Sequence, residues 1–164
     1  YVSKGLESFQ QVQSDYKNKF EVLVVNDGST DDTAKVAEEI LAQDSLLDGR
    51  VITKENGGHG STINRGIQEA KGKFFKVIDG DDWVIPSEFE KFLDTLETVD
   101  VDMVITDFTE QHVYNNTTVR NDLVDKYEIG KKHMGIPDVR IPMHSVTYKT
   151  SIAVFKKQRE NFLK

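Results

Sequence analysis

The sequence contains no cysteine, and this absence excludes disulfide bonds and thiolate metal sites. Without thiols the protein has no disulfide framework and no thiolate metal site, which fits a reducing compartment. No apolar run approaches the roughly 20 residues that a membrane-spanning helix needs, and no signal peptide is visible at the start. A chain of 164 residues corresponds to one ordinary domain, long enough to bury a hydrophobic core.

Positive charge is also scarce. The chain has 28 acidic and 21 basic residues, a formal net charge of −7 and a pI of about 5.1. This balance argues against nucleic acid or an anionic membrane surface as the partner. A nucleotide remains compatible with it, because a bound metal ion can reverse the local sign of the charge.

Several common catalytic signatures are missing as well. The sequence has no GxSxG elbow, Walker A motif or GxGxxG motif, and its four histidines lack the HExxH spacing of a zinc site. We interpret these histidines as structural or surface residues. For His144, in Pro142-Met143-His144-Ser145, the alternative is a place in an acceptor pocket.

The strongest positive signal is an acidic cluster, Asp79-Gly80-Asp81-Asp82, directly after the apolar run Phe74 to Ile78. The run reads as a buried strand, so the carboxylates lie where a strand leaves the core. Like charges packed this closely repel one another unless a cation neutralises them. Carboxylate oxygens suit Mg²⁺ or Mn²⁺, and open α/β sheets bind ligands at this end of their strands. The alternative is a solvated acidic turn before a helix.

Apolar strands and amphipathic helices alternate over the first two thirds of the chain. The pattern predicts an α/β fold with a mostly parallel sheet flanked by helices. Thr30 is the expected N-cap of the second helix, Gly72 the terminator of the third, and Ser87 and Glu90 a capping box for the fourth. The expected helices cover 2–16, 31–43, about 60–71 and a segment from 86 on, and the expected strands 20–25, 51–53, 74–78 and 101–106. Residues 108–119 predict a strand or hairpin, 120–142 a polar loop, and 144–155 a strand and a short helix.

Two further motifs stand at expected strand ends. Asp27-Gly28-Ser29 follows the strand 20–25, where a carboxylate beside a helix start can bind a base or a ribose. The alternative is a turn without a ligand, since Asp, Gly and Ser favour turns. Gly57-Gly58-His59-Gly60 precedes a helix and, with Lys54, is compatible with a phosphate site, or with a flexible connection beside a solvated lysine.

In combination these segments resemble the inverting glycosyltransferase family 2, which has the GT-A fold. Phe20 to Thr33, containing Asp27-Gly28-Ser29, is similar to the family's first nucleotide-binding motif. Glu55-Asn56-Gly57-Gly58 with Asn64 and Gly66 resembles the second, and Gly72 to Trp83 with Pro86 resembles the DxD region. The three motifs follow in the family's order and spacing. Met143 to Thr150 is similar to an acceptor-side segment of some members.

The resemblance implies a fold, a reaction and a set of site residues. The fold would be GT-A, a Rossmann-like and mostly parallel sheet in a single partial domain. Residues 1–106 would bind a nucleotide-sugar donor, most often UDP-linked, and 107–164 would begin the acceptor side. Mn²⁺ or Mg²⁺ would bind at the DxD motif through Asp79, Asp81 and Asp82, with Asp81 closest to the metal. The implied donor-binding residues are Asp27, which contacts the base, and Ser29, Lys54, Asn56, Gly57, Asp79 and Asp81.

The resemblance also implies what this chain lacks. The chain begins without Met, and the family's first apolar strand, with its Pro-x-Tyr-Asn type ending, would lie before Tyr1. The catalytic acidic residue, which activates the acceptor hydroxyl, would lie beyond Lys164. The sequence is thus identified as a member truncated at both ends, and Ile63 stands where many members have an arginine.

The implied acceptor is a saccharide or a lipid-linked molecule, as in polysaccharide or cell-wall synthesis. The implied location is cytoplasmic, and any contact with the inner face of the membrane would come from segments outside this chain. Two alternatives stay open. One is a non-catalytic nucleotide- or metal-binding module, and the other is a receiver-like phosphoacceptor domain, which also gathers carboxylates at strand ends.

Overall fold

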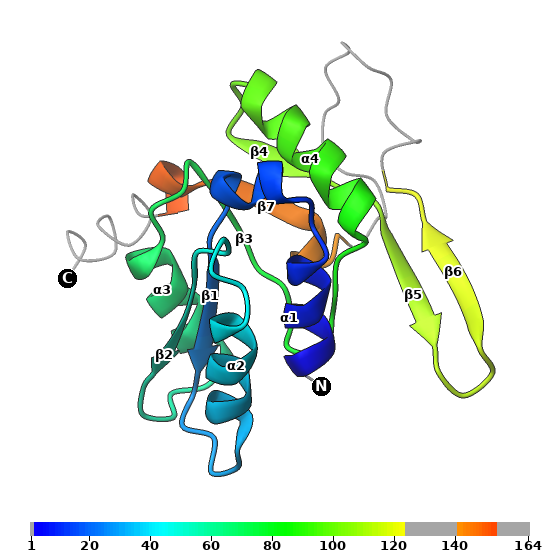
Figure 1. The fold of residues 1–164 in the computed structure, drawn as a ribbon. Helices are drawn as coiled ribbons and strands as arrows, with labels where there is room; N and C mark the ends of the chain where they lie inside the picture. The colour runs from blue at the N-terminus through cyan, green and yellow to red at the C-terminus, as the bar shows by residue number, and fades with distance from the viewer. Residues whose placement is uncertain (1, 124–140, 154–164) are drawn as a thin grey trace.

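The computed structural model describes residues 2–123 and 141–153, which contain four α-helices, two short 3₁₀ helices and seven strands; residues 150–153 are also helical (Figure 1). The helices are α1 (Val2–Gln10), η1 (Ser14–Lys19), α2 (Thr33–Ala42), α3 (His59–Glu69), α4 (Pro86–Thr98) and η2 (Met143–Ser145). The strands are β1 (Val22–Asn26), β2 (Gly49–Thr53), β3 (Phe74–Lys76), β4 (Met103–Ile105), β5 (Phe108–His112), β6 (Thr117–Asn121) and β7 (Val146–Lys149).

The strands form an α/β fold whose pairing is mixed. β1 and β2 are parallel, with Val22 opposite Gly49 and Asn26 opposite Thr53. β7 lies between β3 and β4 and runs antiparallel to both. The predicted α/β class is confirmed, but the parallel pairing is interrupted by β7, a strand that returns from late in the chain. The expected hairpin around Asn115-Asn116 is β5–β6, with Asn116 at a φ of 52° in its turn.

Several local predictions were wrong. The first helix ends at Gln10, because the backbone N–H of Gln13 turns away to bond the carboxylate of Glu90 at 2.9 Å. Glu90 is therefore buried and forms no capping box. Helix α2 starts after Asp32 rather than Thr30, while the Asp31 carboxylate accepts the N–H of Thr33 at 3.0 Å. Helix α3 ends at Glu69, before Gly72.

The hydrophobic core lies where α1 and α2 cover β1 (Figure 1). The helical spacing of the apolar residues in α1 buries Leu6 and Phe9, and α2 contributes Ala37, Ile40 and Leu41. The ring of Phe9 packs edge-on against Phe89 of α4 at a centroid distance of 5.4 Å. This contact joins α4 to α1 and so helps to position the segment between β3 and α4, which carries the acidic cluster.

Candidate functional site

The first half of the site is the Asp27 cluster, in which the carboxylate of Asp27 binds Lys54, Gly57 and Gly58. Asp27 follows β1, and its Oδ1 accepts the N–H of Gly57 at 3.0 Å while its Oδ2 accepts the N–H of Gly58 at 2.8 Å. The ammonium group of Lys54 also pairs with Oδ1. This hydrogen bond from Lys54, followed by those from the two glycine amides, holds the pKa of Asp27 below its usual range. Asp27 thus ties the end of β1 to the start of α3.

Two glycines allow this close approach. Gly28 has a φ of 75°, and a Cβ there would lie 3.0 Å from the backbone nitrogen of Asn56. A Cβ on Gly57 would lie 2.7 Å from the hydroxyl of Ser61 and 3.1 Å from the ammonium nitrogen of Lys54. A larger residue at position 28 would push the backbones of the two loops apart, and one at position 57 would displace the side chains of Ser61 and Lys54.

Lys54 connects the loops further by donating to the backbone oxygen of Glu55 and to the hydroxyl of Ser61, at 2.5 and 2.8 Å. The side chains of Ser29 and Asn56 are exposed and make no hydrogen bond within residues 2–123 and 141–153. They are therefore free to meet a ligand. Sequence reasoning missed the buried Asn26, whose Oδ1 accepts the N–H of Ser29 at 3.1 Å and shapes this turn.

The second half of the site is the acidic loop after β3. This loop contains a tight turn, in which the N–H of Asp82 donates to the carbonyl of Asp79 at 3.0 Å. The turn brings the half-buried carboxylates of Asp79 and Asp82 close together. Ligand atoms of Asp79, Asp82 and His144 lie within 4.8 Å of one another. We call these three residues the Asp-Asp-His group. Asp81 is exposed and lies outside this group, so its role as the residue closest to a metal stays a prediction.

Burial is the main cause that raises the pKa of Asp82, and the carboxylates of Asp79 and Asp81 raise it further. The imidazole of His144, with Nδ1 3.7 Å from Asp82 Oδ2, acts in the opposite direction. The negative charge of this loop is therefore compensated only in part by the protein. A divalent cation would supply the missing charge, and two carboxylates with one imidazole are a suitable ligand set.

His144 reaches the acidic loop from late in the chain. It lies on η2, directly before β7, and its ring packs edge-on against Phe108 at a centroid distance of 4.9 Å. Its carbonyl accepts a hydrogen bond from the ammonium group of Lys76 in β3. Sequence spacing gives no signal for this group, because only the insertion of β7 beside β3 brings His144 to Asp82.

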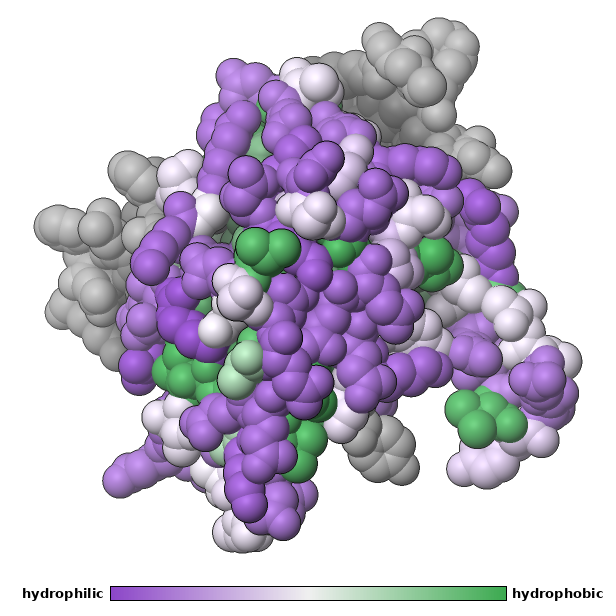
Figure 2. Space-filling view, viewed as in Figure 1, coloured by the Kyte–Doolittle hydropathy of each residue, from purple (hydrophilic) through white to green (hydrophobic). Residues whose placement is uncertain are grey.

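Each half of the site follows a strand, the Asp27 cluster after β1 and the acidic loop after β3. His59, the first residue of α3, lines the same cavity as Asp79 and Asp82. The face of the molecule shown in Figure 2 is mostly hydrophilic, with scattered hydrophobic patches. Among the described residues, no helix has both the length and the apolar character to cross a bilayer.

Comparisons with known proteins agree with this geometry. The sequence model described as Glycosyl transferase family 2 matches residues 4–157. The chain belongs to this family. EpsH of Bacillus subtilis (strain 168), named as a glycosyltransferase, is 34% identical over 128 residues, which cover 78% of this chain and 36% of EpsH. Glycosyltransferase GlyG of Streptococcus pneumoniae is 34% identical over 94 residues, 57% of this chain and 30% of GlyG.

Solved structures show the same fold. TarS of S. aureus, residues 1–349, in complexes with UDP and with UDP-GlcNAc, superposes with a TM-score of 0.68 at 21% identity. The match covers 96% of this chain and 45% of TarS in the UDP complex. The expected GT-A fold is thereby confirmed. The chain spans about a third of the length of the curated relatives it matches.

Lys76 gives a testable pH dependence. Burial lowers its pKa from 10.5 to about 8. Between these two values the unfolded chain binds more protons than the folded one, so stability rises with pH through this window. We expect the free energy of unfolding of the wild type, relative to that of Lys76→Met, to rise by about 3 kcal/mol from pH 7 to pH 10.5, since one pKa unit is worth about 1.4 kcal/mol. Urea unfolding at several pH values measures it.

The matched control is Lys71→Met, which removes an exposed lysine. If the difference between wild type and Lys76→Met stays flat across this range, Lys76 is not desolvated in the folded protein.

Proposed function

We propose that this family 2 chain is the donor-binding part of an inverting glycosyltransferase that uses a UDP-linked sugar and Mn²⁺ or Mg²⁺. The observation that carries the proposal is the Asp-Asp-His group after β3, and the Asp27 cluster that follows β1 supports it. One cluster offers polar groups to a nucleoside and the other offers cation ligands. The UDP and UDP-GlcNAc held by TarS are consistent with a uridine donor.

Asp27 keeps one acceptor position for the base. A carboxylate has about four lone-pair sites, of which Lys54 and Gly57 use two on Oδ1 and Gly58 uses one on Oδ2. The remaining site on Oδ2 accepts an N–H of the base in our proposal. The exposed Ser29 and Asn56 flank this site and bind the nucleoside, while Lys54 and the N-terminus of α3 favour the diphosphate.

The Asp-Asp-His group holds the cation. When bound, this cation neutralises the diphosphate that departs with the nucleotide. Its mixed oxygen and nitrogen ligands favour Mn²⁺ over Mg²⁺, because imidazole suits transition metals. In the sequence-based assignment Asp81 takes a place beside Asp79 and Asp82, and the two assignments differ only in whether Asp81 or His144 is the third ligand.

In the reaction, an acceptor hydroxyl oxygen bonds to the anomeric carbon as the bond from that carbon to the diphosphate oxygen breaks. The hydroxyl proton goes to a carboxylate base, and the configuration of the sugar inverts. We place this base beyond Lys164. Residues 1–106 then serve the donor and 107–164 begin the acceptor side, where a saccharide or a lipid-linked molecule binds.

Isothermal titration of UDP in the presence of Mn²⁺ tests the donor and cation sites. Asp82→Ala and His144→Ala should each weaken binding at least about tenfold, which corresponds to about 1.4 kcal/mol, because each removes a cation ligand. Asp102→Ala and His112→Ala are the matched controls, since both residues are exposed and neither belongs to the Asp-Asp-His group. They should bind as the wild type does.

Asp81→Ala decides between the two ligand sets. Lost binding in Asp81→Ala together with wild-type binding in His144→Ala assigns the cation to the three aspartates instead. Absence of any Mn²⁺-dependent UDP binding in the wild type would refute the donor site itself.

A second candidate function is a non-catalytic donor-binding module, because the Asp27 cluster and the Asp-Asp-His group offer binding groups and cation ligands but no assigned base. A transfer assay with UDP-GlcNAc separates the two. We expect the gene product that includes the residues encoded after Lys164 to release UDP at least about 100-fold faster than residues 1–164, as general base catalysis contributes factors of this size. Equal rates from both, with donor binding intact, would favour the non-catalytic module.

A further inference from the structure

Lys76 is the last residue of β3 and lies shortly before Asp79 in the sequence. It is half-buried, and its ammonium group donates to the backbone carbonyl of His144 and, at 3.4 Å, to the hydroxyl of Thr106. Among the residues that the structure describes, no carboxylate forms an ion pair with it. The charge of Lys76 is thus directed to the backbone that carries His144 and does not neutralise the acidic loop.

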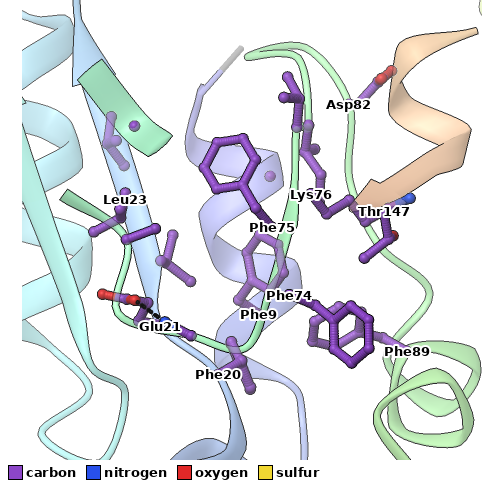
Figure 3. A pocket seen from close by; sticks show the side chains of 18 of the residues that line it. Phe9, Phe20, Glu21, Leu23, Phe74, Phe75, Lys76, Asp82, Phe89 and Thr147 are labelled. Carbon is purple, nitrogen blue, oxygen red and sulfur yellow. Dashed lines mark hydrogen bonds between the residues drawn. The ribbon is translucent and has the colours of Figure 1, made fainter. Parts of the chain in front are cut away.

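His144 lies just beyond the strand ladder of β7. In the β3–β7 pairing the pair nearest to it is Lys76 opposite Thr147, and the β4–β7 pairing ends at Val146. Figure 3 shows Lys76 beside Thr147, with Asp82 on the loop that follows β3. Because His144 belongs to neither register, its peptide group depends on other contacts for its orientation.

Contacts from two sides supply this orientation. The carbonyl of His144 accepts from Lys76, while the carbonyl of Ser145 accepts from the backbone N–H of Thr106 at 2.9 Å. The ring of Phe108 packs against the imidazole at a centroid distance of 4.9 Å. Among these contacts, that of Lys76 is charge-assisted, and such hydrogen bonds are roughly twice as strong as neutral ones. It is also the contact that comes from β3, the strand that leads into the acidic loop.

The link from Lys76 to His144 therefore sets the imidazole against the carboxylates that follow β3. Nδ1 of His144 lies 3.7 Å from Oδ2 of Asp82, which is too long for a direct hydrogen bond. Two ligand atoms at this separation can reach one cation, because the ligands of a small divalent cation lie roughly 2.1 Å from it. The position of the His144 backbone thus decides whether the ring completes the Asp-Asp-His group.

We propose that Lys76 is a positioning residue for the cation site, which holds the carbonyl of His144 and so aims the imidazole at Asp79 and Asp82. This inference rests on the proposed function, because it takes His144 as a ligand of the cation. Residues that orient a ligand without touching the metal typically change metal affinity by about 10–100-fold when they are removed. Lys76 acts in this way through the main chain of the ligand residue.

Titration with Mn²⁺ alone compares Lys76→Met with Lys76→Arg. Methionine keeps an apolar side chain beside the ring of Phe92, whose centroid lies 5.7 Å from the ammonium nitrogen, but it cannot donate a hydrogen bond. We expect Lys76→Met to bind Mn²⁺ at least about tenfold more weakly than the wild type. Lys76→Arg keeps a charged donor and should bind within about threefold of the wild type.

Lys73→Met is the matched control for this titration. Lys73 is exposed and lies directly before β3, so its replacement removes the same charge from the same part of the chain. This variant should bind Mn²⁺ as the wild type does.

Pulsed electron paramagnetic resonance of the bound Mn²⁺ separates positioning from a loss of charge or stability. An imidazole nitrogen bound to Mn²⁺ modulates the electron spin echo at nitrogen frequencies, which carboxylate ligands do not. We expect this nitrogen modulation in the wild type and in Lys76→Arg, and its loss in His144→Ala. In Lys76→Met with saturating Mn²⁺ it should be lost as well, because the cation stays with Asp79 and Asp82 while the imidazole turns away.

A second readout needs no metal. In the metal-free protein the ring protons of His144 and Phe108 should show a nuclear Overhauser contact, in line with their centroid distance of 4.9 Å. We expect this contact to be lost in Lys76→Met and kept in Lys76→Arg and Lys73→Met. The same spectra show whether each variant is folded. Lys76→Gln, which also lacks the charge, takes the place of Lys76→Met if the latter does not fold.

The outcomes separate this proposal from the proposed function. Wild-type nitrogen modulation and an unchanged ring contact in Lys76→Met overturn the positioning role and leave the proposed function intact. A wild type that binds Mn²⁺ without nitrogen modulation overturns His144 as a ligand, and the role of Lys76 with it. If the wild type binds no Mn²⁺, the proposed function fails, and Lys76 has no cation site to position. An equal loss of binding in Lys73→Met would assign the effect to net charge and overturn the proposal.

Discussion

The direction of the strands is the constraint on which the candidate site depends. β1 and β2 are parallel because α2 carries the chain back between them, and the Asp27 turn and Lys54 therefore both follow strand ends at one edge. α3 then starts at this edge and leads to β3, whose end carries the acidic loop. Residues far apart in sequence meet there because helices return each strand to the same starting side.

The two carboxylate clusters of the site differ in how the protein compensates them. Asp27 receives two backbone N–H groups and the Lys54 ammonium group, and its pKa is lowered. Asp82 has only the partial support of His144, and burial raises its pKa. The charge of the first cluster is thus paired within the protein, and this cluster fixes the loops. The second cluster is compensated only in part, which is the property expected of a cation site.

The sequence predicted those parts of the fold that depend on local patterns. The apolar runs located β1, β2 and β3, and the Asp-Gly-Ser and Gly-Gly motifs located the loops that Asp27 joins. Parts that depend on distant contacts were not predictable in this way. Glu90 has the spacing of a capping box, yet it turns inward to bind Gln13, because the burial of α4 against η1 decides its partner.

His144 and β7 show the same limit at the site. Nothing near His144 in sequence indicates a ligand, and its place beside Asp82 follows from the insertion of β7 between β3 and β4. The resemblance pointed to Asp79, Asp81 and Asp82 on the motif alone; ligand atoms of Asp79 and Asp82 lie near His144, and the role of Asp81 stays a prediction. Side-chain direction in a tight turn is set by backbone geometry, which residue identity by itself does not specify.

The most direct test of this account is a crystal structure of the protein with UDP and Mn²⁺, with anomalous scattering used to locate the metal. The account predicts a manganese peak at ligand distance from Asp82 and His144, with the uracil beside Asp27. A manganese ion elsewhere, or a uracil bound away from the Asp27 turn, would contradict it.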